Sequence, residues 1–111
     1  MDLLWTKHSR EKMQFYRLSE QRIKRVLKNP NRVEEGIAPK TIALMQSAGS
    51  KKHPYEIWTM YQKTKTQKLK IISCWRYPGK SPIGVKLPIP DELKGQLESI
   101  LNKIKENEKN Y

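Results

Sequence analysis

The chain has 111 residues and a formal net charge of +12, and this length allows one modest hydrophobic core and not two. No run of about 18 apolar residues occurs, so the sequence predicts no membrane-spanning helix. The first residues also lack the pattern of a signal peptide. Cys74 is the only cysteine, which excludes an internal disulfide, and its apolar neighbours favour a buried, inert thiol. We therefore expect a cytoplasmic protein with no membrane partner.

The positive charge belongs to the body of the chain. Residues 1–90 contain 19 Lys and Arg against 6 Asp and Glu, whereas residues 91–111 contain 4 against 5. A field of this kind concentrates polyanions near the surface, so the sequence favours RNA or the ribosome as partner. Two alternatives stay open: a protein that is merely basic, and, less favoured, an anionic membrane surface.

Two helices are predicted near the N-terminus, over residues 8–16 and 20–29, with a tight joint at Arg17-Leu18. Before them, residues 3–5 are either a first strand or an apolar staple at the helix entry. Ser19 is the expected N-cap of the second helix, and Asn29-Pro30 is its expected end. One face of this helix is apolar and the other faces are basic, through Arg22, Lys24, Arg25 and Lys28.

After Pro30 the hydrophobic period changes to two. The pattern predicts four strands, over residues 32–37, 41–46, 55–62 and 69–77. A loop is expected over 47–54, and a polar turn over 63–68. The last two strands are apolar on both faces, which predicts a place in the middle of the sheet. Short links between successive strands favour an antiparallel meander.

The C-terminal part is predicted to be an extended connector, over the proline-rich residues 78–90, followed by an amphipathic helix. The apolar stripe of this helix consists of Leu93, Leu97, Ile100, Leu101 and Ile104. We expect the helix to cover a sheet face or to dock on the helical pair. The alternatives are that it fills a groove meant for a partner's helix or forms a dimer.

These elements predict an α+β fold: an N-terminal helical hairpin packed on a four-stranded, mainly antiparallel sheet, plus a C-terminal amphipathic helix. We divide the chain into an α+β domain over residues 1–80 and a connector with helix over residues 81–111. The second part is expected to pack on the first.

The N-terminal stretch resembles a signature of the RelE/ParE toxin superfamily, closest to BrnT-like and related uncharacterised toxin-like proteins. The matching residues are His8, Lys12-Met13, Tyr16-Arg17-Leu18-Ser19, Ile23, Val26-Leu27 and Pro30. The segment Ile71–Tyr77 is similar to the closing strand of these proteins, and the resemblance covers about residues 5–80. Residues 81–111 lie outside it.

The resemblance implies a toxin-like, RNA-binding protein of a toxin–antitoxin system, acting as a metal-independent mRNA endoribonuclease. Two other classes stay open. One is a non-catalytic RNA- or ribosome-binding module. The other is a protein-directed member that binds gyrase or an acidic antitoxin. Monomer and homodimer are both compatible with the sequence, and no cofactor is implied.

RNA cleavage by a 2′-hydroxyl requires a base, a group that stabilises the phosphate and an acid, without a metal. His8 is the candidate acid or base, because an imidazole titrates near neutral pH. The alternative is that it caps or orients the first helix. Arg76 is the candidate for phosphate stabilisation, with Tyr77 beside it, and its alternative is an exposed strand charge. RelE-like toxins similarly use arginine, lysine and tyrosine.

Further candidates for RNA contact are basic or aromatic side chains that can bind a phosphate or stack on a base: Arg10, Arg17, Lys52, His53, Trp75 and Lys80. For the basic residues the alternative is a solvated surface position. For Trp75 the alternative is core packing, and an exposed indole would strengthen the RNA hypothesis. The predicted nucleic-acid surface lies within residues 7–86.

Overall fold

The computed structural model describes residues 2–84 and 87–109, and within them three helices and five strands occur. In chain order these are β1 (Leu3–Trp5), α1 (Lys7–Tyr16), α2 (Glu20–Lys28), β2 (Arg32–Glu35), β3 (Thr41–Gly49), β4 (Pro54–Lys63), β5 (Leu69–Pro78) and α3 (Asp91–Lys109). The predicted α+β class is confirmed. No helix in the described part of the chain is long and apolar enough to cross a membrane.

The sheet has the strand order β1-β5-β4-β3-β2. Strands β2 to β5 form the predicted antiparallel meander, and β4 and β5 lie inside the sheet as their two apolar faces indicated. The prediction of four strands was wrong, because β1 adds a fifth strand parallel to β5, with Leu3 opposite Leu69 and Trp5 opposite Ile71. A strand of three residues is too short to show a period of two. Strand β3 also continues to Gly49, into the predicted loop.

Polar caps fix the ends of the two N-terminal helices. The hydroxyl of Thr6 accepts a hydrogen bond from the amide of Ser9 at 3.0 Å and so caps α1. Ser19 caps α2 as predicted, by accepting from the amide of Arg22 at 3.1 Å. Between them, Arg17 ends α1 in the left-handed region, at φ 55° and ψ 50°. This conformation turns the chain out of α1 before α2 begins.

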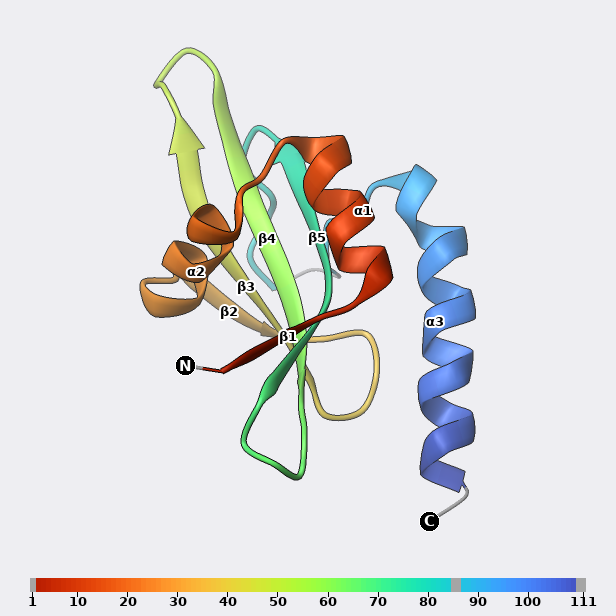
Figure 1. Cartoon of the computed structure of the whole chain (residues 1–111). Coiled ribbons are helices and arrows are strands. Elements are labelled where there is room, and N and C mark those ends of the chain that lie inside the picture. Colours follow the sequence, from red (N-terminus) through yellow and green to blue (C-terminus); the bar gives the residue numbers. More distant parts are fainter. Residues whose placement is uncertain (1, 85–86, 110–111) are drawn as a thin grey trace.

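The two helices lie on the same face of the sheet but over different strands. Helix α1 packs along β5, whereas α2 packs over β3 and β4, and Figure 1 shows them running in different directions. The predicted helical hairpin is therefore wrong in detail: the helices contact the sheet side by side rather than pairing with each other. The apolar residues that each presents to the sheet explain this arrangement, because they join one core cluster with strand residues. That cluster consists of Met13, Leu18, Ile23, Val26, Leu44, Ile57 and Cys74.

A second apolar cluster lies on the other face of the sheet and is covered by α3. It consists of Ala43, Met45, Trp58, Met60, Ile72, Trp75, Leu93 and Leu97. At its centre the rings of Trp58 and Trp75 stack, with centroids 6.0 Å apart and planes 7° apart. Neighbouring residues such as Leu44 and Met45 enter opposite clusters, as the alternation of side chains along a strand requires.

Helix α3 covers a sheet face, which confirms that part of its prediction. Leu93 and Leu97 are 0% and 1% exposed, and Ile100 packs at the margin of the same cluster. The side chains of Leu101 and Ile104, also assigned to the stripe, lie outside the described residues. The start of α3 is also tied to α1, because the hydroxyl of Tyr16 donates to Oε1 of Glu92 at 3.3 Å.

Replacing Leu97 with alanine should lower the free energy of unfolding by about 2–5 kcal/mol, because the substitution leaves a cavity under α3. Ile83→Ala is the matched control, since Ile83 is 82% exposed and its change should stay within about 0.5 kcal/mol. Urea unfolding followed by circular dichroism measures both. Equal stability of the two variants would contradict the packing of α3 on the sheet.

Candidate nucleic-acid interface

Three arginines from two distant parts of the sequence come together on the α2 side of the sheet. Arg22 and Arg25 lie one turn apart on α2, and Arg76 lies near the end of β5. Burial lowers the pKa of Arg22, and the positive charges of Arg25 and Arg76 lower it further. Gln46, which accepts a hydrogen bond from Arg22, stands opposite Ile57, and Ile57 stands opposite Arg76, so Arg22 lies near both Arg25 and Arg76. We call these three side chains the arginine cluster.

Arg76 is held in place by the end of α1. Its Nε donates to the carbonyl oxygen of Tyr16 at 2.7 Å, and its Nη2 donates to that of Arg17 at 3.3 Å. These carbonyls belong to the last turn of the helix and its C-cap, where the helix dipole favours a positive charge. The guanidinium also lies over the ring of Tyr55, 5.0 Å from its centroid. Arg76 thus has a fixed position rather than a free one.

The ring of Tyr55 packs against the guanidinium of Arg76, and Gly49 leaves the space that this ring needs. A Cβ at Gly49 would lie 2.8 Å from Cδ1 of Tyr55 and 2.2 Å from the carbonyl oxygen of His53, and the φ of Gly49 is +81°. Only glycine fits both the space and the backbone conformation at this position. The close approach fixes the Tyr55 ring and the start of the loop with Lys51 and Lys52 beside the cluster.

No acidic side chain in the described part of the chain forms an ion pair with the cluster. The ion pairs found there join Arg10 to Glu20, Arg32 to Glu34 and Glu56, and Lys94 to Asp91. Arg22 instead donates to the amide oxygen of Gln46, which is neutral. The side-chain amide of Gln46 in turn donates to the carbonyls of Asn29 and Arg25, at 3.1 and 3.4 Å. Arg22 and Arg76 are therefore oriented but not neutralised.

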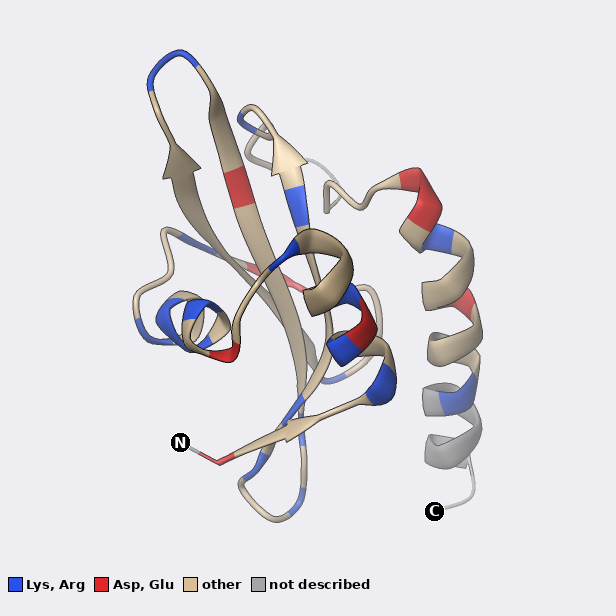
Figure 2. Cartoon of the chain, turned by 45° about the horizontal axis from the view of Figure 1, so that its top comes forward, with Lys and Arg blue, Asp and Glu red and all other residues tan. Residues whose placement is uncertain are grey.

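Other basic residues extend the positive surface around the cluster. Figure 2 shows Lys and Arg (blue) along α2, at the joint between α1 and α2, on β5 and in the loop between β3 and β4. The same view shows Asp and Glu (red) at the start of α3. Lys24 and Lys28 lie on α2, and Lys28 is exposed. A surface of this kind attracts polyanions.

His8 lies apart from the arginine cluster. It stands in the first turn of α1, whereas Arg76 binds the last turn, and a helix of this length rises about 12 Å between such positions. Its Nε2 lies 3.0 Å from Oγ of Ser73, a residue that is fully buried. The structure therefore does not bring the predicted acid or base to the predicted phosphate-binding arginine.

Trp75 and Tyr77 do not contribute to this surface. Trp75 is 0% exposed and stacks on Trp58, so the core-packing alternative holds and the indole is unavailable to a base. Tyr77 is half-buried and packs against the cluster under α3, on the opposite face from the side chain of Arg76. Both corrections follow from alternation along β5, which directs every second side chain away from α1 and α2.

The remaining predicted contact residues are exposed, but at different places. Arg10 pairs with Glu20 at 2.8 Å and lies over the ring of Trp5, so an acid offsets its charge. Arg17 is exposed at the joint between α1 and α2, where it borders an open hollow of about 400 Å³. Lys52 and His53 lie in the loop before Tyr55, next to the cluster, and Lys80 follows β5.

The sequence singled out Arg76 as a candidate but not Arg22, Arg25 and Tyr55, which the structure places beside it. The two arginines were visible as part of the basic faces of the second helix, with a spacing of three that places them on one side. The sequence pattern does not reveal the direction of the turn at Arg17, which brings α2 towards Arg76. Without that turn the arginines are ordinary surface charges.

The described residues include no group of three or more His, Cys, Asp or Glu side chains placed to hold a metal ion. Cys74 is buried beneath α1, and burial raises the pKa of its thiol to about 12. A thiol in this state is a poor nucleophile at neutral pH. The guanidinium groups of the arginine cluster are suited to the binding of anions.

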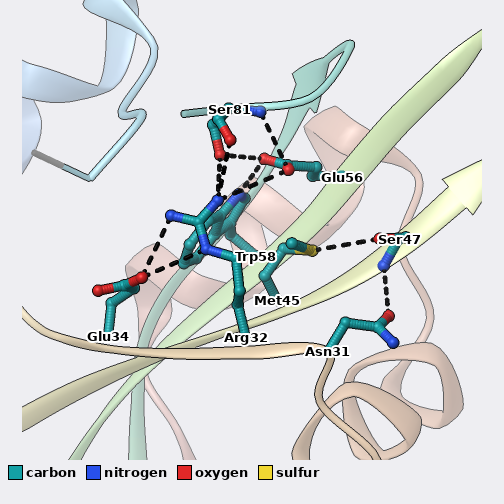
Figure 3. A network of polar contacts seen from close by, with 8 residues as sticks. All are labelled: Asn31, Arg32, Glu34, Met45, Ser47, Glu56, Trp58 and Ser81. Carbon is teal, nitrogen blue, oxygen red and sulfur yellow. Dashed lines mark hydrogen bonds and ion pairs between the residues drawn. The ribbon is translucent and has the colours of Figure 1, made fainter. Parts of the chain in front are cut away.

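A second polar constellation, shown in Figure 3, is structural. The buried carboxylate of Glu56 accepts hydrogen bonds from Nε1 of Trp58 at 3.0 Å and from Oγ of Ser81 at 2.6 Å. Arg32 donates to Ser81 Oγ and O, at 2.7 and 3.1 Å, and pairs with Glu34 at 3.2 Å. This network joins β2, β4 and the connector, and Arg32 forms ion pairs with both of its carboxylates.

Comparisons with known proteins return no relative: no family model, no curated protein and no solved structure matches the chain.

His8 should make the stability of the protein depend on pH. Burial, followed by the charge of Lys12, lowers its pKa from 6.5, so the folded state favours the neutral imidazole. Below pH 6.5 the unfolded chain takes up the proton first, and stability should therefore fall as pH decreases through this range. His8→Gln should flatten that fall, measured by urea unfolding at intervals between about pH 8 and pH 5. His53→Gln, in an exposed loop, is the control, and an unchanged pH profile in His8→Gln would refute the assignment.

Proposed function

We propose that this protein binds RNA through the arginine cluster and the basic residues around it. The observation that supports the proposal is the meeting of three guanidinium groups without an acidic partner in the described part of the chain. Guanidinium groups form strong, charge-assisted hydrogen bonds with phosphate oxygens. A repeating phosphate backbone would satisfy all three groups at once.

The composition of the surface favours a polyanion over an acidic protein such as an antitoxin or gyrase. Stable protein interfaces contain a buried apolar centre with a polar rim. The large exposed apolar residues of the described chain are scattered: Leu4, Phe15, Val33, Ile37 and Ile83. None of them belongs to α2 or to β5, where the cluster lies. Co-purification of the protein with an acidic polypeptide in place of nucleic acid would favour the protein-directed alternative.

Arg25→Ala is the sharpest test of RNA binding, because Arg25 is exposed and its side chain is not needed to hold α2 on the sheet. A charge-assisted hydrogen bond contributes about 1.5–3 kcal/mol, so RNA affinity should fall roughly tenfold or more. Arg25→Lys should retain part of the affinity. Fluorescence anisotropy with a labelled RNA measures the dissociation constants.

Lys94→Ala removes a positive charge from α3, outside the proposed surface, and is the matched control. RNA binding that is lost equally in Arg25→Ala and Lys94→Ala would show a non-specific charge effect. An unchanged affinity in Arg25→Ala would remove the cluster as the binding surface.

A second candidate, the metal-independent endoribonuclease that the resemblance implies, is favoured by the place of Tyr55. Its ring lies beneath the guanidinium of Arg76, and its phenol is close enough to Arg22 to favour the charged form of that side chain. An O–H group beside guanidinium groups is a chemical arrangement suited to proton transfer at a phosphate that the arginines stabilise. In this version Tyr55 takes the role that sequence analysis gave to His8, which lies at the other end of α1.

Tyr55→Phe separates the two functions. If the protein cleaves RNA, the variant should lose about 10²–10⁴-fold in cleavage rate while its RNA affinity stays the same. Gel assays with free mRNA and with translating ribosomes measure the cleavage, and growth after induced expression measures toxicity. Intact RNA in both assays and normal growth would exclude the endoribonuclease and leave the binding function in place.

A further inference from the structure

In the described part of the chain, Tyr55 is the aromatic side chain found in contact with the arginine cluster. Trp58 and Trp75 are fully buried, and the face of Tyr55 is covered by the guanidinium of Arg76. Phe15 is the single aromatic residue that is mostly exposed in the described part, at 63%. It lies near Nζ of Lys12 on α1, and no contact joins it to the cluster. A base that approached the cluster would therefore find no free ring to stack on.

The side-chain amide of Gln46, which could recognise the edge of a base, is occupied as well. Gln46 is the amide side chain beside the cluster, and amides are the groups that discriminate bases by paired donor and acceptor atoms. Its oxygen accepts from Arg22, and its nitrogen donates to two backbone carbonyls. The fixed amide orients Arg22 but cannot also bind a base. What remains available to a ligand is positive charge.

Further positive charge extends along α2. Arg22, Arg25 and Lys28 succeed one another every three residues, so each lies about 4.5 Å further along the helix. Arg76 lies to one side of Arg22, because it stands opposite Ile57 and Ile57 stands opposite Gln46, the hydrogen-bond partner of Arg22. Positive charges spread over α2 and the end of β5 fit a series of phosphates better than they fit a single small anion.

We propose that the ligand is double-helical RNA, bound through its phosphate backbone and without recognition of base sequence. The inference rests on the RNA-binding function proposed above and specifies its substrate class. Proteins that bind single strands depend on stacking of the bases on aromatic side chains, which this surface lacks. Double-stranded RNA is recognised through its shape and its phosphates, which require only what the surface offers. A duplex also has the higher charge density.

The test compares four ligands of equal length, roughly 16 base pairs or nucleotides. They are two RNA duplexes of different sequence, the DNA duplex of one of them, and an unstructured oligouridine strand. We expect the two RNA duplexes to bind with dissociation constants within about threefold of each other, and oligouridine to bind at least about tenfold more weakly. The DNA duplex should bind within about tenfold of its RNA counterpart, since phosphates are common to both.

The salt dependence identifies the contacts. The slope of log K against log salt on a duplex should become less negative by about 0.9 in Arg25→Ala, because one phosphate contact is lost. Phe15→Ala should leave both affinity and slope unchanged, and Lys94→Ala is again the control for charge outside the surface.

Each other outcome has a separate meaning. Oligouridine that binds as tightly as the duplexes, or a preference above about tenfold for one RNA duplex, would overturn duplex-backbone recognition but not RNA binding. Loss of oligouridine binding in Phe15→Ala would point to base stacking and would also overturn it. Absence of binding to both RNA duplexes and to oligouridine would refute the proposed function itself.

Discussion

The hydrogen bonds from Arg76 to the last carbonyls of α1 are the contacts on which the arrangement of this protein depends. They satisfy two backbone groups that a helix end would otherwise leave to water, and they place a positive charge at the negative end of the helix dipole. At the same point the chain turns through Arg17 in the left-handed conformation and starts α2. The side chain of Arg76 on β5 thus binds the end of α1. It also lies near the part of α2 that carries Arg22 and Arg25.

The rest of the fold keeps this surface rigid. Both faces of the sheet are covered, by α1 and α2 on one side and by α3 on the other. The strands cannot shift register without exposing one of the two clusters, because a slip of one residue exchanges the faces. The stacked tryptophans and the buried Glu56 network fix the far side, and the close approach of Gly49 to Tyr55 fixes the near side. The residues of the proposed binding surface are thereby separate from the residues that form the two core clusters.

Most helices and strands could be predicted from the sequence because each depends on local patterns. The apolar stripe of α2, its cap at Ser19 and the period of two in β4 and β5 need no distant partner. Strand β1 was left undecided because it is defined by its pairing with β5, at the other end of the core sequence. The arginine cluster was missed for the same reason. The basic composition located a surface in residues 7–86 but could not separate Arg22 from any other exposed cation.

The cluster keeps its positive charge at every physiological pH because its members are arginines. A group of lysines or histidines crowded together could relieve its repulsion by releasing a proton, but a guanidinium group stays charged throughout the physiological pH range. Gln46 and the carbonyls of Tyr16 and Arg17 orient the charges with dipoles and do not cancel them. A negatively charged partner would therefore relieve the repulsion that Arg22 experiences from Arg25 and Arg76. Because the positive charge of the cluster does not change with pH, the surface is suited to an anion that is itself always charged, as the phosphodiester backbone is.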